Sequence, residues 1–167
     1  MKRLETIPEV DVRLKQAYEE ERRLFGKWDA SLNVNQQGPL WFGRPDIASM
    51  VNQCLHYSSP LDYNLHTFCI MPNHVHMVFT PTLRADETYR SLDSIMHSIK
   101  SFTAHQAKKI LGRKGAFWQS ESYDHVVRDA KEGNRIAAYI IYNPVKAGLV
   151  DDPDDWPWTY VAEGLMG

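Results

Sequence analysis

The sequence is poor in cysteine and has no long apolar run. Its two cysteines, Cys54 and Cys69, fit neither a zinc-binding spacing nor a disulfide framework, so we expect two buried thiols in a reducing compartment. No stretch reaches the roughly 18 apolar residues of a membrane-spanning helix, and the opening MKRLETIPEV lacks the apolar core of a signal peptide. These absences predict a cytoplasmic protein with no membrane partner.

A strong net charge is missing as well. The formal charge at pH 7 is −2, while hydrophobic residues make up 43% of the 167 residues. This apolar content excludes an intrinsically disordered chain, and the length is that of one ordinary domain. We therefore treat residues 1–167 as a single domain, with a helical N-terminal segment at about 8–45 and an acidic tail at about 151–167.

The spacing of apolar residues predicts helices and strands that alternate without a parallel βαβ series. Two stretches rich in β-formers, 64–70 and 74–80, flank a turn at Pro72-Asn73 and predict a β-hairpin, and 125–127 predicts a further strand-like segment. The sequence thus predicts an α+β fold, a small antiparallel sheet with flanking helices on one face. Four helical segments are predicted. The first two are residues 10–25 and a helix that Asp46 caps. The other two are residues 91–110 and a helix that begins at Asp129 and ends at about Tyr142, because Pro144 cannot continue it.

Two histidines lie two residues apart in the stretch MPNHVHMVF. Alternate side chains of a strand share a face, so His74 and His76 project together and can reach one metal ion. A partly exposed strand with two incidental polar residues explains the pair just as simply. A histidine-triad hydrolase needs a third histidine two residues further on, where Val78 stands. A zinc hydrolase usually needs a third His, Cys or acidic ligand, and the sequence offers no obvious one nearby.

A second group of polar side chains occurs in RIAAYIIYNPVKAGLV, residues 135–150. Tyr139 and Asn143 are four residues apart, so a helix places them on one face, with Tyr142 one step away. Tyrosine commonly packs at the edge of a core, and Asn-Pro is a good helix stop. Alone, this segment does not indicate a site.

Together the two segments indicate a specific chemistry. Two imidazole nitrogens and one amide oxygen suit a divalent ion with open positions, such as Mg²⁺ or Mn²⁺, acting on phosphate oxygens. A tyrosine oxygen near that ion is a candidate nucleophile. Covalent catalysis of this kind preserves the energy of the phosphodiester bond, so a second hydroxyl can rejoin the strand without ATP.

Four stretches, MPNHVHMVF, YIIYNPVKAGLV, GPLWFGRPDIASMVNQCLHY and FWQSESYDHVVRD, together resemble the HUH-type tyrosine transposases, named for their His-hydrophobic-His pair. The resemblance is greatest to the REP-associated branch of bacterial members and extends from about Gly38 to Trp158. It implies the ferredoxin-like HUH fold and a substrate of single-stranded DNA folded into hairpins, the repetitive extragenic palindromes. Members usually open with an additional β-strand, which the residues before the helical pattern at 10–25 do not offer.

The resemblance also implies residue roles. His74 and His76 form the metal-binding pair, and Asn143 supplies a third metal ligand. Tyr139 is the nucleophile that becomes linked to a DNA 5′-phosphate. The implied function is metal-dependent cleavage and strand transfer of single-stranded DNA, with Mg²⁺ or Mn²⁺ as cofactor. The transposing relatives are dimers and the REP-associated branch tends to act as a monomer, so both states stay open.

The local charge agrees with a nucleic-acid partner although the net charge does not. Between Lys100 and Lys146 the chain has nine basic and four acidic residues, a local charge of +5. A solvated helix face explains this excess as well as DNA binding does. Lys146 follows Asn-Pro-Val, where the family pattern keeps a lysine, and is a candidate phosphate contact. Further candidate DNA-binding residues are Lys100, Arg128 and Arg135.

Two other functions remain open from the sequence. One is a hairpin-DNA binding module without catalysis. The other is a metal-dependent phosphodiesterase in which water, rather than tyrosine, attacks the phosphate. A third ligand such as His125 near the histidine pair would favour this second function.

Overall fold

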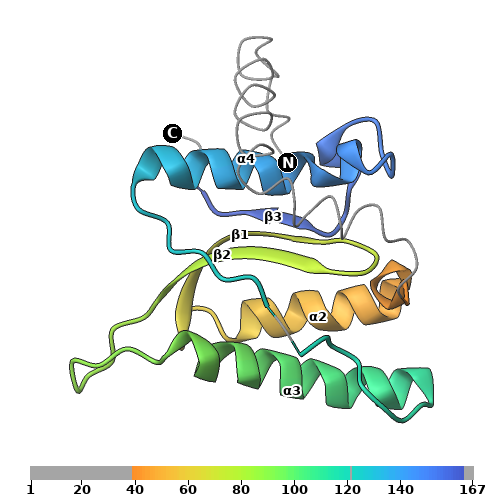
Figure 1. Ribbon diagram of the computed structural model, residues 1–167, viewed down its shortest axis with the longest axis horizontal. Helices are drawn as coiled ribbons and strands as arrows, with labels where there is room; N and C mark the ends of the chain where they lie inside the picture. The colour runs from red at the N-terminus through yellow and green to blue at the C-terminus, as the bar shows by residue number, and fades with distance from the viewer. Residues whose placement is uncertain (1–38, 121, 164–167) are drawn as a thin grey trace.

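The computed structural model describes residues 39–120 and 122–163, so the helix predicted at 10–25 lies outside the described residues. Within them, a three-stranded antiparallel sheet lies between two layers of helix (Figure 1). α2 (Pro45–Tyr57) covers one face with α3 (Leu92–Leu111) packed against it, while α4 (Ala130–Lys146) covers the other face. The α+β class is confirmed, but the expectation that all helices share one face is wrong.

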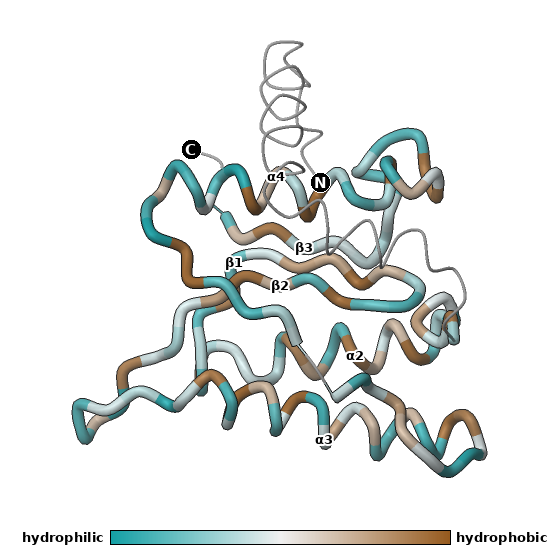
Figure 2. The backbone as a smooth tube through the Cα atoms, viewed as in Figure 1, coloured by the Kyte–Doolittle hydropathy of each residue, from teal (hydrophilic) through white to brown (hydrophobic). Residues whose placement is uncertain are grey.

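The second half of the central strand β1 (Tyr63–Ile70) is buried on both faces, from Thr67 to Ile70, in agreement with the two helix layers. Phe68 and Ile70 belong to the core cluster shared with α2 and α3, whereas Cys69 packs with residues of α4. The pairing with the next strand shifts by one residue after Leu65, which keeps Leu65 and Phe68 in the same core cluster. Figure 2 shows hydrophobic residues along the strands, between the helix layers.

The predicted hairpin is present, with β1 followed by the antiparallel strand β2 (Val75–Pro81). Pro72 and Asn73 connect the strands, and the Met71 N–H donates to the His74 carbonyl at 2.8 Å across this turn. His74 therefore lies at the end of the turn, one residue before β2 begins. The sequence placed it inside the strand.

Side chains alternate between the two faces of β2, as the sequence predicts. Val75, Met77 and Phe79 pack against the core cluster that includes α2. His76 lies opposite Cys69 in the register of the two strands, and Cys69 packs on the α4 side. The hairpin thus directs its second histidine toward α4.

Side-chain and glycine caps define three helix ends. The Ser91 side chain accepts a hydrogen bond from the first turn of α3, and Gly112 ends that helix with a left-handed φ of 60°. Asp129 caps α4 by accepting a hydrogen bond from the Glu132 N–H at 2.8 Å. The sequence predicted helices with nearly these bounds, at 91–110 and from Asp129, but not the Ser91 cap.

Pro144 does not end α4, which continues to Lys146. The stop signal is Gly148, whose φ of 69° is left-handed. The Gly148 and Leu149 N–H groups both donate back into the last turn, at 3.0 and 2.9 Å, in the pattern of a Schellman motif. Because the glycine sets the helix end, Asn143 lies inside regular helix rather than at its stop.

Two further predictions are wrong in detail. α2 begins at Pro45, so Asp46 lies in its first turn and binds the Arg44 guanidinium at 2.7 Å instead of capping the helix. Residues 125–127 form no strand. This segment is held to the start of α4 by Glu132, whose carboxylate contacts the His125 ring at 3.1 Å and accepts a hydrogen bond from the Arg128 backbone N–H at 2.7 Å.

The acidic tail supplies the third strand, which the sequence did not predict. β3 (Thr159–Val161) pairs antiparallel with β1, and Tyr160 lies opposite Phe68. The indole N–H of Trp156 donates to the Ile70 carbonyl at 3.1 Å, so the tail is also anchored by a side chain. Three residues are too few to show a period-two pattern, which explains why this strand was missed.

Two short 3₁₀ helices complete the described elements. η1 (Trp41–Gly43) lies against the hairpin turn, where the Phe42 N–H donates to the Pro72 carbonyl at 3.0 Å, and η2 (Pro153–Asp155) contacts α4. Across 39–120 and 122–163, no helix has both the length and the apolar character that crossing a membrane requires.

Candidate active site

The two histidines of the hairpin converge. The Nε2 atoms of His74 and His76 are 2.9 Å apart, and their ring planes meet at 83°. Two ligand atoms that each lie about 2.1 Å from an ion, at a right angle to each other, are about 3 Å apart. The pair therefore has the spacing of two adjacent metal ligands.

Asn73 orients the first histidine. Its side-chain oxygen lies 2.6 Å from His74 Nδ1 and, because an amide oxygen can only accept, Nδ1–H is the donor. With the proton on Nδ1, the lone pair of His74 is on Nε2, the atom beside His76. Sequence reasoning missed Asn73, although an amide residue directly before the first histidine of a tight turn was a usable signal.

α4 brings Tyr139 to the hairpin. The Tyr139 and His76 rings have centroids 5.9 Å apart and nearly perpendicular planes, at 84°. Ile136 and Ile140 pack beside the tyrosine, as the helical spacing predicts. Asn143 lies one turn further along the same helix and is fully buried. The fold thus joins the histidine pair and the tyrosine, which are about 65 residues apart in the chain.

The two halves of this site differ in exposure. His76 is half-buried, whereas Tyr139 is 4% exposed and Asn143 is 0% exposed. The hydroxyl oxygen of Tyr139 and the amide nitrogen of Asn143 are both buried. A substrate would reach the His76 imidazole more easily than the phenol, while His74 is itself 9% exposed.

The donor set fits a divalent ion with open coordination positions. Within the part of the chain that the structure describes, no three histidine, cysteine or acidic side chains are grouped as a metal site. His74 and His76 would supply two nitrogens, and oxygen atoms of an amide, water or phosphate would complete the shell. Among the described residues, His125 forms no such metal-binding group with the pair, and its Nε2 lies 3.1 Å from a Glu132 carboxylate oxygen.

Cys69 lies on the same side of the sheet but is chemically inert there. Burial raises the pKa of the Cys69 thiol to about 12, although a hydrogen bond with Thr159 opposes this shift. The thiol therefore stays protonated near neutral pH and offers neither a thiolate nucleophile nor a thiolate ligand. Both cysteines are buried free thiols, as predicted.

A buried carboxylate holds the start of α4. Glu132 is 4% exposed and accepts hydrogen bonds from the Arg128 guanidinium at 2.9 and 3.3 Å and from the Arg128 backbone N–H at 2.7 Å. These hydrogen bonds, the guanidinium contribution first, lower the pKa of Glu132 to about 2. The cluster fixes the helix end about two turns before Tyr139. The sequence predicted a helix start at Asp129 but not this buried cluster.

The predicted DNA-binding residues occupy unlike environments. Lys146 is exposed in the last turn of α4, and Arg135 is half-buried on the same helix. The Arg128 guanidinium is exposed but bonded to Glu132, which raises the pKa of Arg128 further. Lys100 reaches from α3 to the connection that leads to α4. Lys146 and Arg135 therefore lie on α4, the helix that carries Tyr139, whereas Arg128 and Lys100 form contacts that support local structure.

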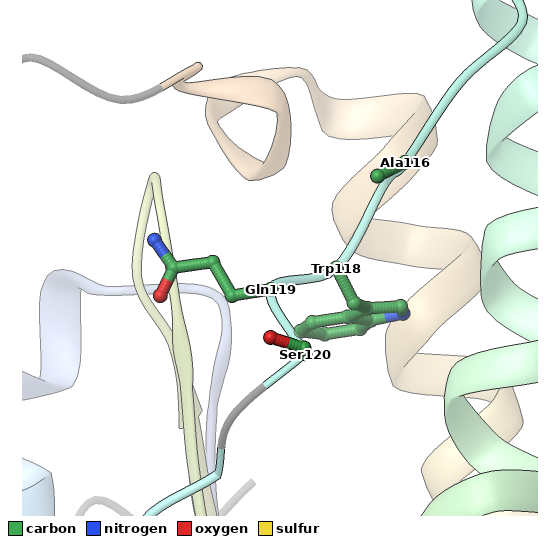
Figure 3. Close-up of a pocket in the computed structure, with 4 residues that line it drawn as sticks. All are labelled: Ala116, Trp118, Gln119 and Ser120. Atoms are coloured by element: carbon green, nitrogen blue, oxygen red, sulfur yellow. The ribbon is translucent and has the colours of Figure 1, made fainter.

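The connection between α3 and α4 carries a pocket apart from the predicted residues. Lys100 anchors this segment by donating to the Ser122 hydroxyl at 2.6 Å. An open pocket of about 550 Å³ lies along it, with Gln119 extending away from the Trp118 indole (Figure 3). None of the predicted catalytic or metal-binding residues lines it; the lining residues are Ala116, Trp118, Gln119 and Ser120.

Comparison with known proteins points to one family. The family described as "Transposase IS200 like" matches residues 43–143. A Haemophilus influenzae protein provisionally named REP-associated tyrosine transposase is 27% identical over 111 residues, covering 64% of this chain and 61% of that protein. The REP-associated tyrosine transposase of Escherichia coli K12 is 29% identical over 107 residues, covering 62% and 59%. No solved structure matched the chain.

The matched region runs from the end of η1 to Asn143, so it contains the hairpin, both histidines and the tyrosine. The chain spans about three fifths of the length of the curated relatives it matches. Those relatives carry the name of the REP-associated branch, in agreement with the resemblance seen in the sequence. Because the family match covers more than half of its residues, this chain belongs to the IS200-like transposase family.

Proposed function

We propose that this protein cleaves single-stranded DNA beside a hairpin and rejoins it through a covalent link to Tyr139. One observation carries the proposal: the Tyr139 ring lies 5.9 Å, between centroids, from one of two histidines whose Nε2 atoms converge. A nucleophile beside a divalent-ion site is what phosphoryl transfer to tyrosine requires. The names of the relatives support a REP-type hairpin as the DNA.

The proposed metal ligands are His74, His76 and the side-chain oxygen of Asn143. A divalent ion, Mg²⁺ or Mn²⁺, supplies Lewis-acid polarisation of the phosphate oxygens when bound. The two imidazoles present adjacent lone pairs, and Asn73 keeps one of them in the binding orientation. Because Asn143 lies on α4, its binding to the ion would link the position of this helix, which carries Tyr139, to the position of the metal site.

The chemical step is a displacement at phosphorus. The Tyr139 oxygen loses its proton to water and bonds to the phosphorus, while the bond from phosphorus to the 3′-oxygen breaks. The leaving 3′-oxygen takes up a proton from water, so a free 3′-hydroxyl forms and no net proton is lost. The DNA 5′-phosphate is then esterified to tyrosine. Attack by another 3′-hydroxyl reverses the step and joins a new strand, so no nucleotide cofactor is consumed.

Access to the tyrosine is part of the proposal. The phenol oxygen is buried, so a scissile phosphate reaches it only after a local displacement on DNA binding. Lys146, exposed at the end of the same helix, would bind a backbone phosphate and so couple DNA binding to α4.

A covalent-adduct assay tests the function. Hairpin DNA with a single-stranded flank, Mn²⁺ and the wild-type chain should give an adduct that survives denaturing electrophoresis. Tyr139→Phe should give none, and EDTA should abolish the wild-type adduct. Tyr142→Phe, three residues along the same helix, is the matched control and should retain it. An adduct formed by Tyr139→Phe, or one lost only in Tyr142→Phe, contradicts the assignment.

Both halves of the site come from one chain, so we propose that a monomer is competent. Mixing His76→Ala with Tyr139→Phe tests this directly. If the site is formed within one chain, the mixture stays inactive, because neither protein holds both halves. Restored adduct formation would mean that the tyrosine acts on the metal site of a second copy, as a homodimer permits.

A further inference from the structure

We propose that the pocket on the connection between α3 and α4 binds one unpaired base of the DNA strand, with Trp118 stacking on the base and Arg113 binding a neighbouring phosphate. The inference rests on the proposed function, because it takes hairpin DNA with a single-stranded flank as the ligand. It places a DNA contact outside the candidate active site, on the surface formed by η1, the end of α3 and the connection that follows.

The Trp118 indole is held in place on its protein side. Its Nε1–H donates to the Thr103 hydroxyl at 2.8 Å, and its ring lies 4.9 and 5.4 Å, between centroids, from those of Phe42 and Phe117. The side chain is nevertheless only half-buried, and it lines the open pocket (Figure 3). A ring that is already ordered loses little conformational entropy when a base stacks on it.

The lining of this pocket combines apolar and hydrogen-bonding groups. Trp118 and Ala116 supply apolar surface, while Gln119 and Ser120 supply an amide and a hydroxyl. The volume of about 550 Å³ is in the range of small-molecule sites, about 300–1,000 Å³. A nucleobase has a flat apolar face and hydrogen-bonding edges, so this lining suits a base.

The chain around the pocket is positively charged. Residues 105–120 contain four basic residues and no acidic residue, whereas the whole chain has a net charge of −2. Two of the four, Lys108 and Lys109, lie in the last turn of α3. A local excess of this sign attracts a phosphate backbone and repels acidic ligands, which favours a nucleotide over other planar ligands.

Arg113 is the basic side chain that lies against the rings beside Trp118. Its guanidinium carbon is 4.5 Å from the centroid of the Trp41 ring, and Trp41 stacks on Phe117 with centroids 5.2 Å apart. Its Nη2 lies 4.0 Å from the position that a Cβ would occupy at Gly115, just before the pocket. Arg113 is exposed, and a guanidinium can bind a phosphate while it remains over an aromatic ring. The phosphate contact is therefore Arg113 rather than its neighbour Lys114.

The same group of rings is joined to the histidine hairpin. Phe42 packs on Trp118, and its backbone N–H donates to the Pro72 carbonyl at 3.0 Å. Pro72 lies two residues before His74 in the chain. One residue of η1 thus connects the pocket to the turn that carries the candidate metal site, so a strand that leaves this site past η1 would reach Trp118.

Binding measured in EDTA tests the stacking role without cleavage. Fluorescence anisotropy compares a hairpin that has single-stranded flanks with the same hairpin without them. Trp118→Leu removes the ring and should weaken binding of the flanked hairpin about 10-fold, as expected for one stacked base, with less than about a twofold change on the blunt hairpin. Trp118→Phe also loses the hydrogen bond to Thr103 but keeps a ring, so it should bind the flanked hairpin within about threefold of wild type.

These two variants separate stacking from a purely structural role. If Trp118 only packs against the core, Trp118→Leu and Trp118→Phe should weaken binding equally, or Trp118→Leu should weaken binding of both DNAs by the same factor. Either result overturns the proposal.

An abasic site placed at each flank position in turn identifies the bound base. We expect one position at which loss of the base weakens wild-type binding about 10-fold but has no further effect on Trp118→Leu. The absence of such a position, or an equal loss in both proteins at every position, overturns the proposal.

Arg113→Ala tests the phosphate contact, with Lys114→Ala as its matched control, because both side chains are exposed. On the flanked hairpin, Arg113→Ala should reduce the salt dependence of log Kd by about one unit, and Lys114→Ala should leave it unchanged. Equal salt slopes for the two variants overturn the assignment of Arg113.

The outcomes distinguish this inference from the proposed function. If one flank base depends on Trp118 but no Tyr139 adduct forms, the base-binding pocket stands and the strand-transfer function fails. If the adduct forms on Tyr139 but no flank base depends on Trp118, the function stands and this inference fails.

Discussion

The two halves of the site are built differently. The histidine half lies on a hairpin, with His76 half-buried and His74 9% exposed, and the His74 ring is oriented by a hydrogen bond to Asn73 in the turn. The tyrosine half lies on α4, is buried, and is held by packing and by a capped helix start two turns away. In the proposed mechanism, ion binding and covalent attack depend on separate elements, so substitutions should damage one while leaving the other intact.

The largest effect on one half of the site alone is expected from His76→Ala. Removing one of two nitrogen ligands should lower metal affinity at least 100-fold and abolish the adduct, with little loss of thermal stability because His76 is half-buried. Tyr139→Phe should abolish the adduct but keep metal affinity within about threefold of wild type. Calorimetric titration with Mn²⁺ measures both. Equal metal affinity in wild type and His76→Ala would contradict the claim that the histidine half binds the ion.

Asn143 is expected to join the two halves. Its side chain is fully buried, so Asn143→Leu should reduce metal affinity and also destabilise the fold by about 1–3 kcal/mol, because the groups packed around it lose a polar partner. Denaturant unfolding with and without Mn²⁺ separates these effects. If unfolding is affected while metal affinity is unchanged, Asn143 supports structure only.

Whether the sequence predicted an element depends on how far apart in the chain the residues that determine it lie. The hairpin, the capping box at Asp129 and the histidine face depend on neighbours within a few residues, and they were predicted. β3 and the second helix layer depend on pairing across the chain, which local periodicity cannot show. Pro144 was misjudged because a local breaker was given more weight than the glycine stop that follows it.

Site prediction had the same limits. Helical spacing identified Tyr139 and Asn143 as neighbours, but the distance from Tyr139 to His76 is a tertiary fact. The sequence suggested Lys100 as a DNA contact from its charge, whereas its ammonium donates to Ser122 in the structure. The sequence shows that a side chain is charged, but it does not show which group that side chain contacts in the folded protein.

A pH-dependent effect is expected from the cap of α4. The pKa of Glu132 is lowered to about 2, below its unfolded value, so its contribution to stability is complete above about pH 4.5 and is lost as pH falls toward 2. Glu132→Gln should therefore lower the Tm at pH 7 by several degrees but have little effect at pH 2. Circular dichroism melts at both values measure this. A Tm difference that does not shrink in acid contradicts the role of the carboxylate.

The smallest effect is expected at Lys146. Lys146→Ala should leave Tm and metal affinity unchanged and weaken hairpin binding by a few fold, with the salt dependence of log Kd falling by about one unit. Lys114→Ala, an exposed lysine beyond the end of α3, is the matched control. Fluorescence anisotropy over a salt series compares them. Equal salt slopes for the two variants would remove Lys146 from the DNA interface.

Mass spectrometry of the trapped adduct tests the central claim most directly. The wild-type chain is incubated with hairpin DNA and Mn²⁺, the DNA is trimmed with nuclease, and the protein is digested and sequenced by fragmentation. We predict a nucleotide joined through its 5′-phosphate to the side chain of Tyr139. A nucleotide on Tyr142 or on any other residue, or cleaved DNA with an unmodified Tyr139 peptide throughout the reaction, would contradict the account.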